Sequence, residues 1–207
     1  MPALLLETRP AVVSFHFGLP PAPVVARLKA AGVVLFSTAT NLDKGQRAVA
    51  AGVDAIVAQG YEAGGHRSVF DPAARDSQLC HPLDPAPVEH TLRADDRRRQ
   101  RHGRGGIAAM LDLGAHAAQL GTAFIGCPES SADQYYRDAL LGPAAAATEM
   151  TALISGRHAR CLPNALTALR SGPLQGLEPP DYPIAYDAGK ALAAAARARN
   201  EGGFGAQ

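Results

Sequence analysis

Short apolar runs rich in β-branched residues alternate with helical patterns between residues 11 and 59, and this alternation constrains the fold more than any other feature. We expect three strands, at 12–17, 33–38 and 53–58. Two helices separate them, and each ends at a glycine, Gly32 or Gly52, as helices commonly do. Strands that alternate with helices indicate βαβ units and a parallel sheet, which places the chain in the α/β class.

The same order returns after a gap. Ile107, Met110 and Leu111 share a helical face before Gly114, and a strand of small residues follows at 117–124. Between 80 and 105 we expect no strand and no regular helix, although a βα barrel would need another unit there. Beyond residue 128 the pattern predicts helices, notably 130–141 and 187–200.

Composition excludes several classes of protein. A chain of 207 residues with 47% apolar content can bury one sizeable core, and a net charge of +1 gives no reason to expect nucleic acid as a partner. The three cysteines are far apart, which fits neither a disulfide framework nor a zinc site, so we expect no bound metal. No signal peptide or membrane span is predicted, and a cytoplasmic location is the simplest expectation.

A glycine-rich loop follows the third expected strand, and it is the first candidate site. Gly60, Gly64 and Gly65 allow the backbone to approach a ligand and to present amide donors to it. His66 closes the loop, and a neutral imidazole is a common general base for removing a proton from carbon. The alternative is a histidine in an ordinary surface turn, because a Gly-Gly-His triplet is not specific.

A second candidate site lies on the strand predicted at 117–124. It consists of Gln119, Leu120, Gly121 and Thr122, where a glycine and a hydroxyl at a strand end could hold a phosphate. The alternative is a tight corner of a barrel, and the residue pattern favours that alternative. His16, on the first strand, is expected in the core or the barrel lining.

Four segments, taken in order, resemble the FMN-dependent nitronate monooxygenases, once called 2-nitropropane dioxygenases. They are Val13–Pro20, Gln59–Arg67, Gln119–Phe124 and Pro180–Pro183. The resemblance implies a partial TIM barrel, with FMN bound in residues 1–127 and a small helical substrate region with a C-terminal helix in 128–207. It implies that His66 is the catalytic base. It also implies that FMN contacts Gln59, Gly64, Gly65, Gln119, Leu120, Gly121 and Thr122.

The implied activity is the flavin-dependent oxidation of small alkyl nitronates or nitroalkanes by dioxygen, with His66 accepting a proton from a neutral nitroalkane. Two alternatives stay open. The related flavin-dependent enoyl-acyl carrier protein reductases share a similar glycine-glycine-histidine loop. The third possibility is an inactive fragment of the family, because the chain starts and ends inside the family's pattern and resembles a truncated member.

An arginine-rich stretch interrupts the resemblance. The family has a buried strand where this chain reads Asp96–Gly103, and one choice of codons for these residues, shifted by one base, encodes a strand-like apolar sequence. This consistency favours a local frameshift over a selected polyanion-binding patch, and no aromatic residue is interleaved for base stacking. Because buried arginines carry a large desolvation cost, we predict that 80–105 is exposed or poorly ordered.

Overall fold

The computed structural model describes residues 2–79, 90–93, 104–173, 175–199, 201 and 204. The chain divides into two compact units, and each is described by itself. The described residues of unit 1 lie within 1–61, 68–94 and 100–120, and those of unit 2 lie within 62–67 and 121–207. The boundary predicted after residue 127 stays a prediction.

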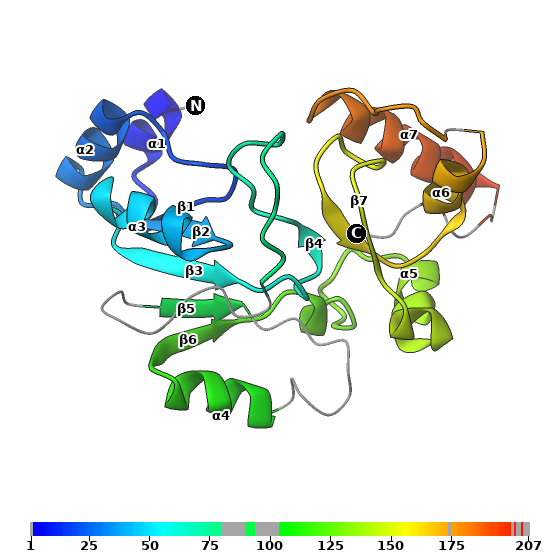
Figure 1. Cartoon of the computed structure of the whole chain (residues 1–207), viewed down its shortest axis with the longest axis horizontal. Helices are drawn as coiled ribbons and strands as arrows, with labels where there is room; N and C mark the ends of the chain where they lie inside the picture. The colour runs from blue at the N-terminus through cyan, green and yellow to red at the C-terminus, as the bar shows by residue number, and fades with distance from the viewer. Residues whose placement is uncertain are drawn as a thin grey trace. The chain divides into compact units, whose positions relative to one another are not determined.

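Unit 1 is built on a five-stranded sheet whose order is β1-β2-β3-β5-β6, with every neighbouring pair parallel (Figure 1). The strands are β1 (Val12–Phe15), β2 (Val34–Ala39), β3 (Ala55–Gln59), β5 (His90–Arg93) and β6 (Ala115–Gln119). The helices are α1 (Pro2–Thr8), α2 (Ala22–Ala30), α3 (Leu42–Ala50) and α4 (Arg104–Asp112). This order of elements confirms the α/β class and the partial βα barrel.

The core of unit 1 follows from the helical faces read in the sequence. Val25 and Leu28 of α2 pack against Val33 and Leu35, and all four side chains are buried. The helix α3 begins at a side-chain cap, in which Asn41 accepts a hydrogen bond from the backbone N of Lys44 at 3.0 Å. Figure 1 shows α2 and α3 beside β1, β2 and β3, and α4 beside β6.

The strand β5 corrects the expectation of an irregular segment at 80–105. His90–Arg93 pairs with β3 on one side and with β6 on the other, so both edges of this short strand are hydrogen-bonded. Backbone pairing on two sides holds four residues in a strand although their side chains show no readable alternation. The rest of that expectation, including most of the arginine-rich stretch and the proposed frameshift, lies outside the described residues, apart from α4, which begins at Arg104.

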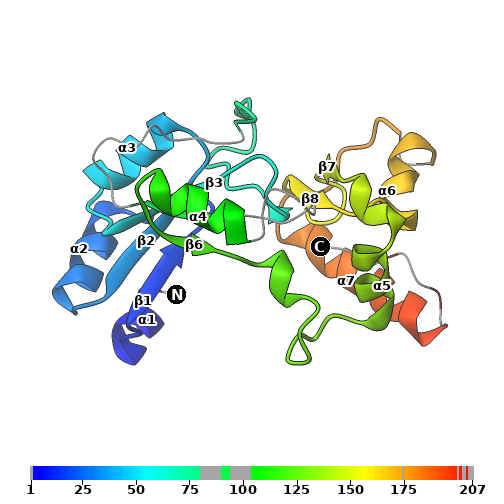
Figure 2. The same ribbon diagram turned by 90° about the horizontal axis from the view of Figure 1, so that it is seen from below.

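Unit 2 combines a small antiparallel sheet with helices. The sheet has the order β4-β8-β7. Figure 2 shows β7 and β8 side by side. Its strands are β4 (Gly65–His66), β7 (Glu149–Thr151) and β8 (Ala159–Cys161). Its helices are α5 (Gln134–Leu141), α6 (Ala165–Ala168) and α7 (Ile184–Ala198), with short 3-10 turns η1 (Thr122–Phe124), η2 (Pro143–Ala146) and η3 (Leu169–Ser171). The helices α5 and α7 were expected, whereas α6 and the strands β4, β7 and β8 were not.

Buried apolar side chains join the small sheet to α6. Ile154, Ala159, Cys161 and Leu166 form one cluster, against which Phe204 also packs. In the part of the chain that the structure describes, no helix is long and apolar enough to cross a membrane.

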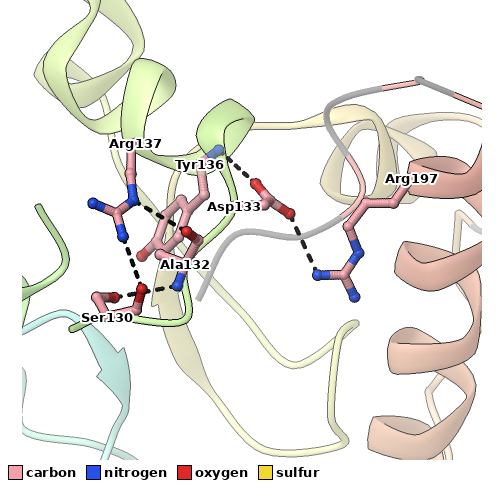
Figure 3. Close-up of polar contacts among 6 residues, drawn as sticks. All are labelled: Ser130, Ala132, Asp133, Tyr136, Arg137 and Arg197. Atoms are coloured by element: carbon pink, nitrogen blue, oxygen red, sulfur yellow. Dashed lines mark hydrogen bonds and ion pairs between the residues drawn. The ribbon is translucent and has the colours of Figure 1, made fainter. Parts of the chain in front are cut away.

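The start of α5 is fixed by side chains (Figure 3). Asp133 caps the helix, accepting from the backbone N of Tyr136 at 2.8 Å, and its second oxygen accepts from Arg197 of α7 at 3.4 Å. Arg137 donates to the carbonyl oxygens of Ala132 and Ser130 at 3.1 and 2.8 Å. A capping carboxylate of this kind stabilises a helix by about 1 kcal/mol.

Candidate functional site

Gln59 ends the central strand β3 and is fully buried. Its side-chain Oε1 accepts a hydrogen bond from the backbone N of Ser68 at 2.8 Å. The Ser68 hydroxyl lies against the carbonyl oxygens of His16 and Thr38, which share its single proton as acceptors. Gln59, the predicted flavin contact, therefore takes part in a hydrogen-bond network that links the carboxyl ends of β1, β2 and β3. Parallel sheets bind ligands at this edge.

His16 and Thr38 belong to the same buried polar network. The His16 Nδ1 lies 3.3 Å from the Thr38 Oγ1, and His16 is half-buried. Its expected place in the core or lining of the barrel agrees with this position.

The second predicted segment changes conformation within its four residues. Gln119 is exposed at the end of β6 and Leu120 follows it in unit 1, whereas Gly121 and Thr122 belong to unit 2. The strand expected to run to Phe124 is wrong, because it ends at Gln119 and Thr122–Phe124 forms the 3-10 turn η1. The Phe124 N bonds to the Gly121 O at 3.0 Å, a turn bond that a strand cannot make.

Thr122 lines a hollow of about 660 Å³ in unit 2. Arg137 and Leu141 also line it, and the three carbonyl bonds of the Arg137 guanidinium, including one to Gly126 at 3.2 Å, keep that wall in place. Thr122 is thus one of the residues that line a cavity large enough for part of a small molecule.

Gly64 and Gly65 lead into β4. Gly65 has φ of +75°, a backbone conformation that strongly favours glycine. Among the described residues other than its two chain neighbours, no atom lies within 4 Å of where a Cβ would stand. Space beside a bare backbone is what the glycine-rich loop was predicted to provide.

His66 lies on β4, which pairs with β8, so it is not a residue of a surface turn. Its partner in the register is Ala159, and the next residue, Arg67, donates its backbone N to the His158 O at 2.8 Å. These backbone hydrogen bonds fix the position of the His66 main chain, from which the imidazole extends.

Three side chains surround the half-buried imidazole of His66. The Nε2 lies 2.8 Å from the Oγ of Ser155, which is fully buried. The rings of Tyr182 and Tyr186 meet the imidazole edge-on, with centroids 5.6 and 5.9 Å away, and they stack on each other at 6.0 Å. The hydroxyl and the two aromatic rings thus contact the imidazole and restrict its orientation.

Burial lowers the pKa of His66 below its usual value of 6.5, and the positive charge of Arg157 lowers it further. The imidazole is therefore neutral at pH 7 and able to accept a proton.

Sequence reasoning missed Ser155 and Tyr186, which contact His66 from residues far away in the chain. Tyr182 lies in the segment Pro180–Pro183, which was singled out by resemblance but given no role. Tyr182 precedes α7 and Tyr186 lies in its first turn, so no helical periodicity in the sequence pairs the two rings.

The chain was compared with known proteins. The family model described as nitronate monooxygenase matches residues 3–86 and 102–204, and its match is interrupted across most of the arginine-rich stretch. A nitronate monooxygenase of Paraburkholderia phytofirmans is 55% identical over 211 residues, covering 100% of this chain and 56% of the relative. One of Pseudomonas aeruginosa is 47% identical over 213 residues, covering 99% of this chain and 58% of the relative. The chain thus spans somewhat more than half the length of these relatives.

Solved structures give the same result for the fold. A nitroalkane oxidase from Streptomyces ansochromogenes superposes with a TM-score of 0.80 at 37% identity, covering 96% of this chain and 57% of that one. FabK from Thermotoga maritima superposes with a TM-score of 0.63 at 22% identity, covering 98% and 62%, and this likeness concerns the fold alone.

Proposed function

Because the chain belongs to the nitronate monooxygenase family, a flavin-dependent family of oxidoreductases, we propose that it oxidises alkyl nitronates and nitroalkanes, with His66 as the catalytic base. We further propose FMN as the flavin, dioxygen as the oxidant and the cytoplasm as the compartment. The relatives at 55% and 47% identity are named nitronate monooxygenases, which favours this function over the enoyl reductase alternative.

The environment of His66 carries the proposal. A neutral nitroalkane must lose a proton from the carbon beside its nitro group before it can be oxidised as a nitronate, and a base that is neutral at pH 7 can take it. Burial keeps the imidazole uncharged, while Ser155, Tyr182 and Tyr186 hold its orientation. A preformed nitronate has already lost that proton, so it needs His66 far less.

The residues predicted to hold FMN fit a flavin in two respects. Gly65 leaves open space beside its backbone, and Gln119 is exposed at the carboxyl end of β6. Gln59, Gly64, Leu120, Gly121 and Thr122 complete the proposed set. When bound, the flavin would supply the electron acceptor, which no side chain of the proposed site can replace.

The experiment compares two substrates in His66→Ala. The purified 207-residue chain is loaded with FMN, and oxygen uptake is followed with a neutral nitroalkane and with the preformed nitronate. We expect His66→Ala to lower turnover of the nitroalkane by roughly 10²-fold or more, the usual contribution of a general base, and to lower turnover of the nitronate much less. Equal losses on the two substrates would exclude the general-base role.

His158→Ala is the matched control. His158 is exposed in the same unit and contributes its backbone carbonyl, not its ring, to the bond with Arg67. We expect normal turnover of both substrates in this variant. A wild-type chain that stays colourless after FMN is added would contradict the cofactor assignment.

A further inference from the structure

The hydroxyl of Ser155 makes three contacts, and together they determine how its proton is used. Its Oγ donates to the carbonyl oxygen of Arg157 at 3.1 Å and accepts from the backbone N of Arg157 at 3.3 Å. The third contact is the Nε2 of His66 at 2.8 Å. A serine hydroxyl has one proton to donate and two lone pairs with which to accept.

One assignment satisfies all three contacts. The Arg157 carbonyl can only accept, so it takes the serine proton, and the Arg157 N–H can only donate, so it takes one lone pair. The remaining lone pair of the Ser155 Oγ can only accept, so the Nε2 of His66 must carry a hydrogen. If Ser155 donated to His66 instead, the Arg157 carbonyl would lose this donor at a site where Ser155 is fully buried.

The position of Ser155 is fixed by close packing of its neighbours. Gly156 has φ of +80°, and a Cβ there would collide with the backbone of Pro180 and Tyr182. On the other side, Gly189 of α7 brings its backbone against the Ile154 carbonyl, where a Cβ would stand 2.9 Å from the oxygen. The turn that carries Ser155 therefore packs closely against the segment that carries Tyr182.

We propose that Ser155 is a positioning residue that fixes His66 as the Nε2–H tautomer, so that Nδ1 is the nitrogen that accepts the substrate proton. This rests on the proposed function only for the identity of the substrate. When Nδ1 gains the proton, the Nε2–H bond to Ser155 is kept, so proton transfer requires no rotation of the hydroxyl. The imidazolium then carries a hydrogen on each nitrogen, and the substrate is left as the nitronate anion.

The test is nitrogen NMR of the 207-residue chain with labelled histidine, at a pH where His66 is neutral. His66→Gln identifies the His66 signals among those of the seven histidines. We expect the directly bonded ring proton on Nε2, visible because its hydrogen bond to Ser155 slows exchange with water. A ring proton found on Nδ1 would overturn the proposal, and this measurement needs no variant of Ser155.

Two substitutions of Ser155 then test whether its hydroxyl protects the Nε2–H of His66 from exchange. In Ser155→Ala we expect the Nε2–H signal to be lost to exchange, and in Ser155→Thr, which keeps the hydroxyl, we expect it to persist. Ser171→Ala, at an exposed serine of the same unit, is the matched control and should leave the spectrum unchanged. An Nε2–H signal that survives unchanged in Ser155→Ala would contradict the role of Ser155.

The outcome is separable from that of the proposed function. The spectra require neither FMN nor turnover, so the tautomer can be right even if the chain oxidises no nitronate. In an active preparation, Ser155→Ala is expected to lower turnover of the neutral nitroalkane roughly tenfold and to affect the preformed nitronate less, since a misoriented base loses part of the general-base contribution. Equal losses would count against positioning of the base.

Discussion

The surroundings of His66 determine the charge of its imidazole. An isolated histidine titrates near pH 6.5 and is partly charged at neutral pH. Here burial removes water that would stabilise the imidazolium, and Arg157 adds a repelling charge, so both effects lower the pKa of His66. The rings of Tyr182 and Tyr186 contribute apolar edges to that burial. At neutral pH the imidazole of His66 is therefore uncharged and can accept a proton from a ligand.

The contribution of Arg157 can be measured separately. In Arg157→Gln the positive charge is removed while the backbone N and O that bond to Ser155 are kept. We expect the pKa of His66 to rise, because one of its two causes is gone, yet to stay below 6.5, because desolvation is the larger cause and persists. Titration of the His66 ring protons by NMR measures this.

Arg170→Gln is the control for this change. Arg170 is exposed on η3, and its replacement removes the same charge from the same unit. The pKa of His66 should not move in that variant. A pKa of His66 that falls or stays constant in Arg157→Gln would show that the charge of Arg157 does not act on the ring.

At the residue scale, the sequence singled out His66 but not Ser155 or Tyr186, which contact it. His66 could be predicted because a glycine-rich loop after a strand is a local pattern that the family resemblance made specific. Ser155 lies 89 positions away, and a serine between isoleucine and glycine has no distinctive signal. The long-range pairing of β4 with β8 brings the turn that carries Ser155 near the imidazole.

At the scale of elements, a glycine decides how closely the turn after β7 can approach the segment before α7. Gly156 combines a positive φ with backbone atoms of Pro180 and Tyr182 where a Cβ would stand. Gly176 has a similar φ, +76° against +80°, but within the described part of the chain nothing besides its two neighbours lies within 4 Å of its Cβ position. A substitution at Gly176 therefore tests backbone strain alone, whereas the same substitution at Gly156 tests backbone strain together with steric collision.

We expect Gly176→Ala to lower the free energy of unfolding by roughly 1–2 kcal/mol, the cost of a left-handed alanine. Gly156→Ala should carry that cost and about 1–3 kcal/mol more, because the new methyl group is forced into packed backbone. Urea unfolding followed by circular dichroism measures both. If both variants lost the same free energy of unfolding, the backbone around Gly156 would be able to accommodate a methyl group without destabilisation.

The elements found from the sequence were those with enough residues to show a period. The strands β2 and β3 lie within one or two residues of their expected bounds, and the helices α2 and α3 end at Ala30 and Ala50, just before the expected Gly32 and Gly52. The missed strands β4, β7 and β8 have two or three residues each, too few for an alternating pattern. Their conformation depends on antiparallel pairing between distant segments, as that of β5 depends on its two parallel neighbours.

At the scale of the whole molecule, each unit contains a group whose pKa is shifted, and the two groups act in different ranges of pH. In unit 1, Asp54 bonds to the side chain of Lys29 at 2.6 Å and to the backbone N of Leu35 at 2.8 Å. The bond to Lys29 is the main cause that lowers the pKa of Asp54 below 3.8. Stability from Asp54 is therefore present above pH 3.8 and lost as the pH falls below it.

The shift of His66 has the same sign but acts nearer neutral pH. Below pH 6.5 the unfolded chain binds a proton at this histidine while the folded chain does not, so the unfolded state gains stability as the pH falls. We expect wild type to lose stability between about pH 7.5 and pH 5 more steeply than His66→Gln, whose side chain does not titrate. Urea unfolding at several pH values, compared between the two chains, measures the difference. If His66 were protonated as readily in the folded as in the unfolded chain, the two slopes would be equal, and the neutral base on which proton abstraction depends would not exist.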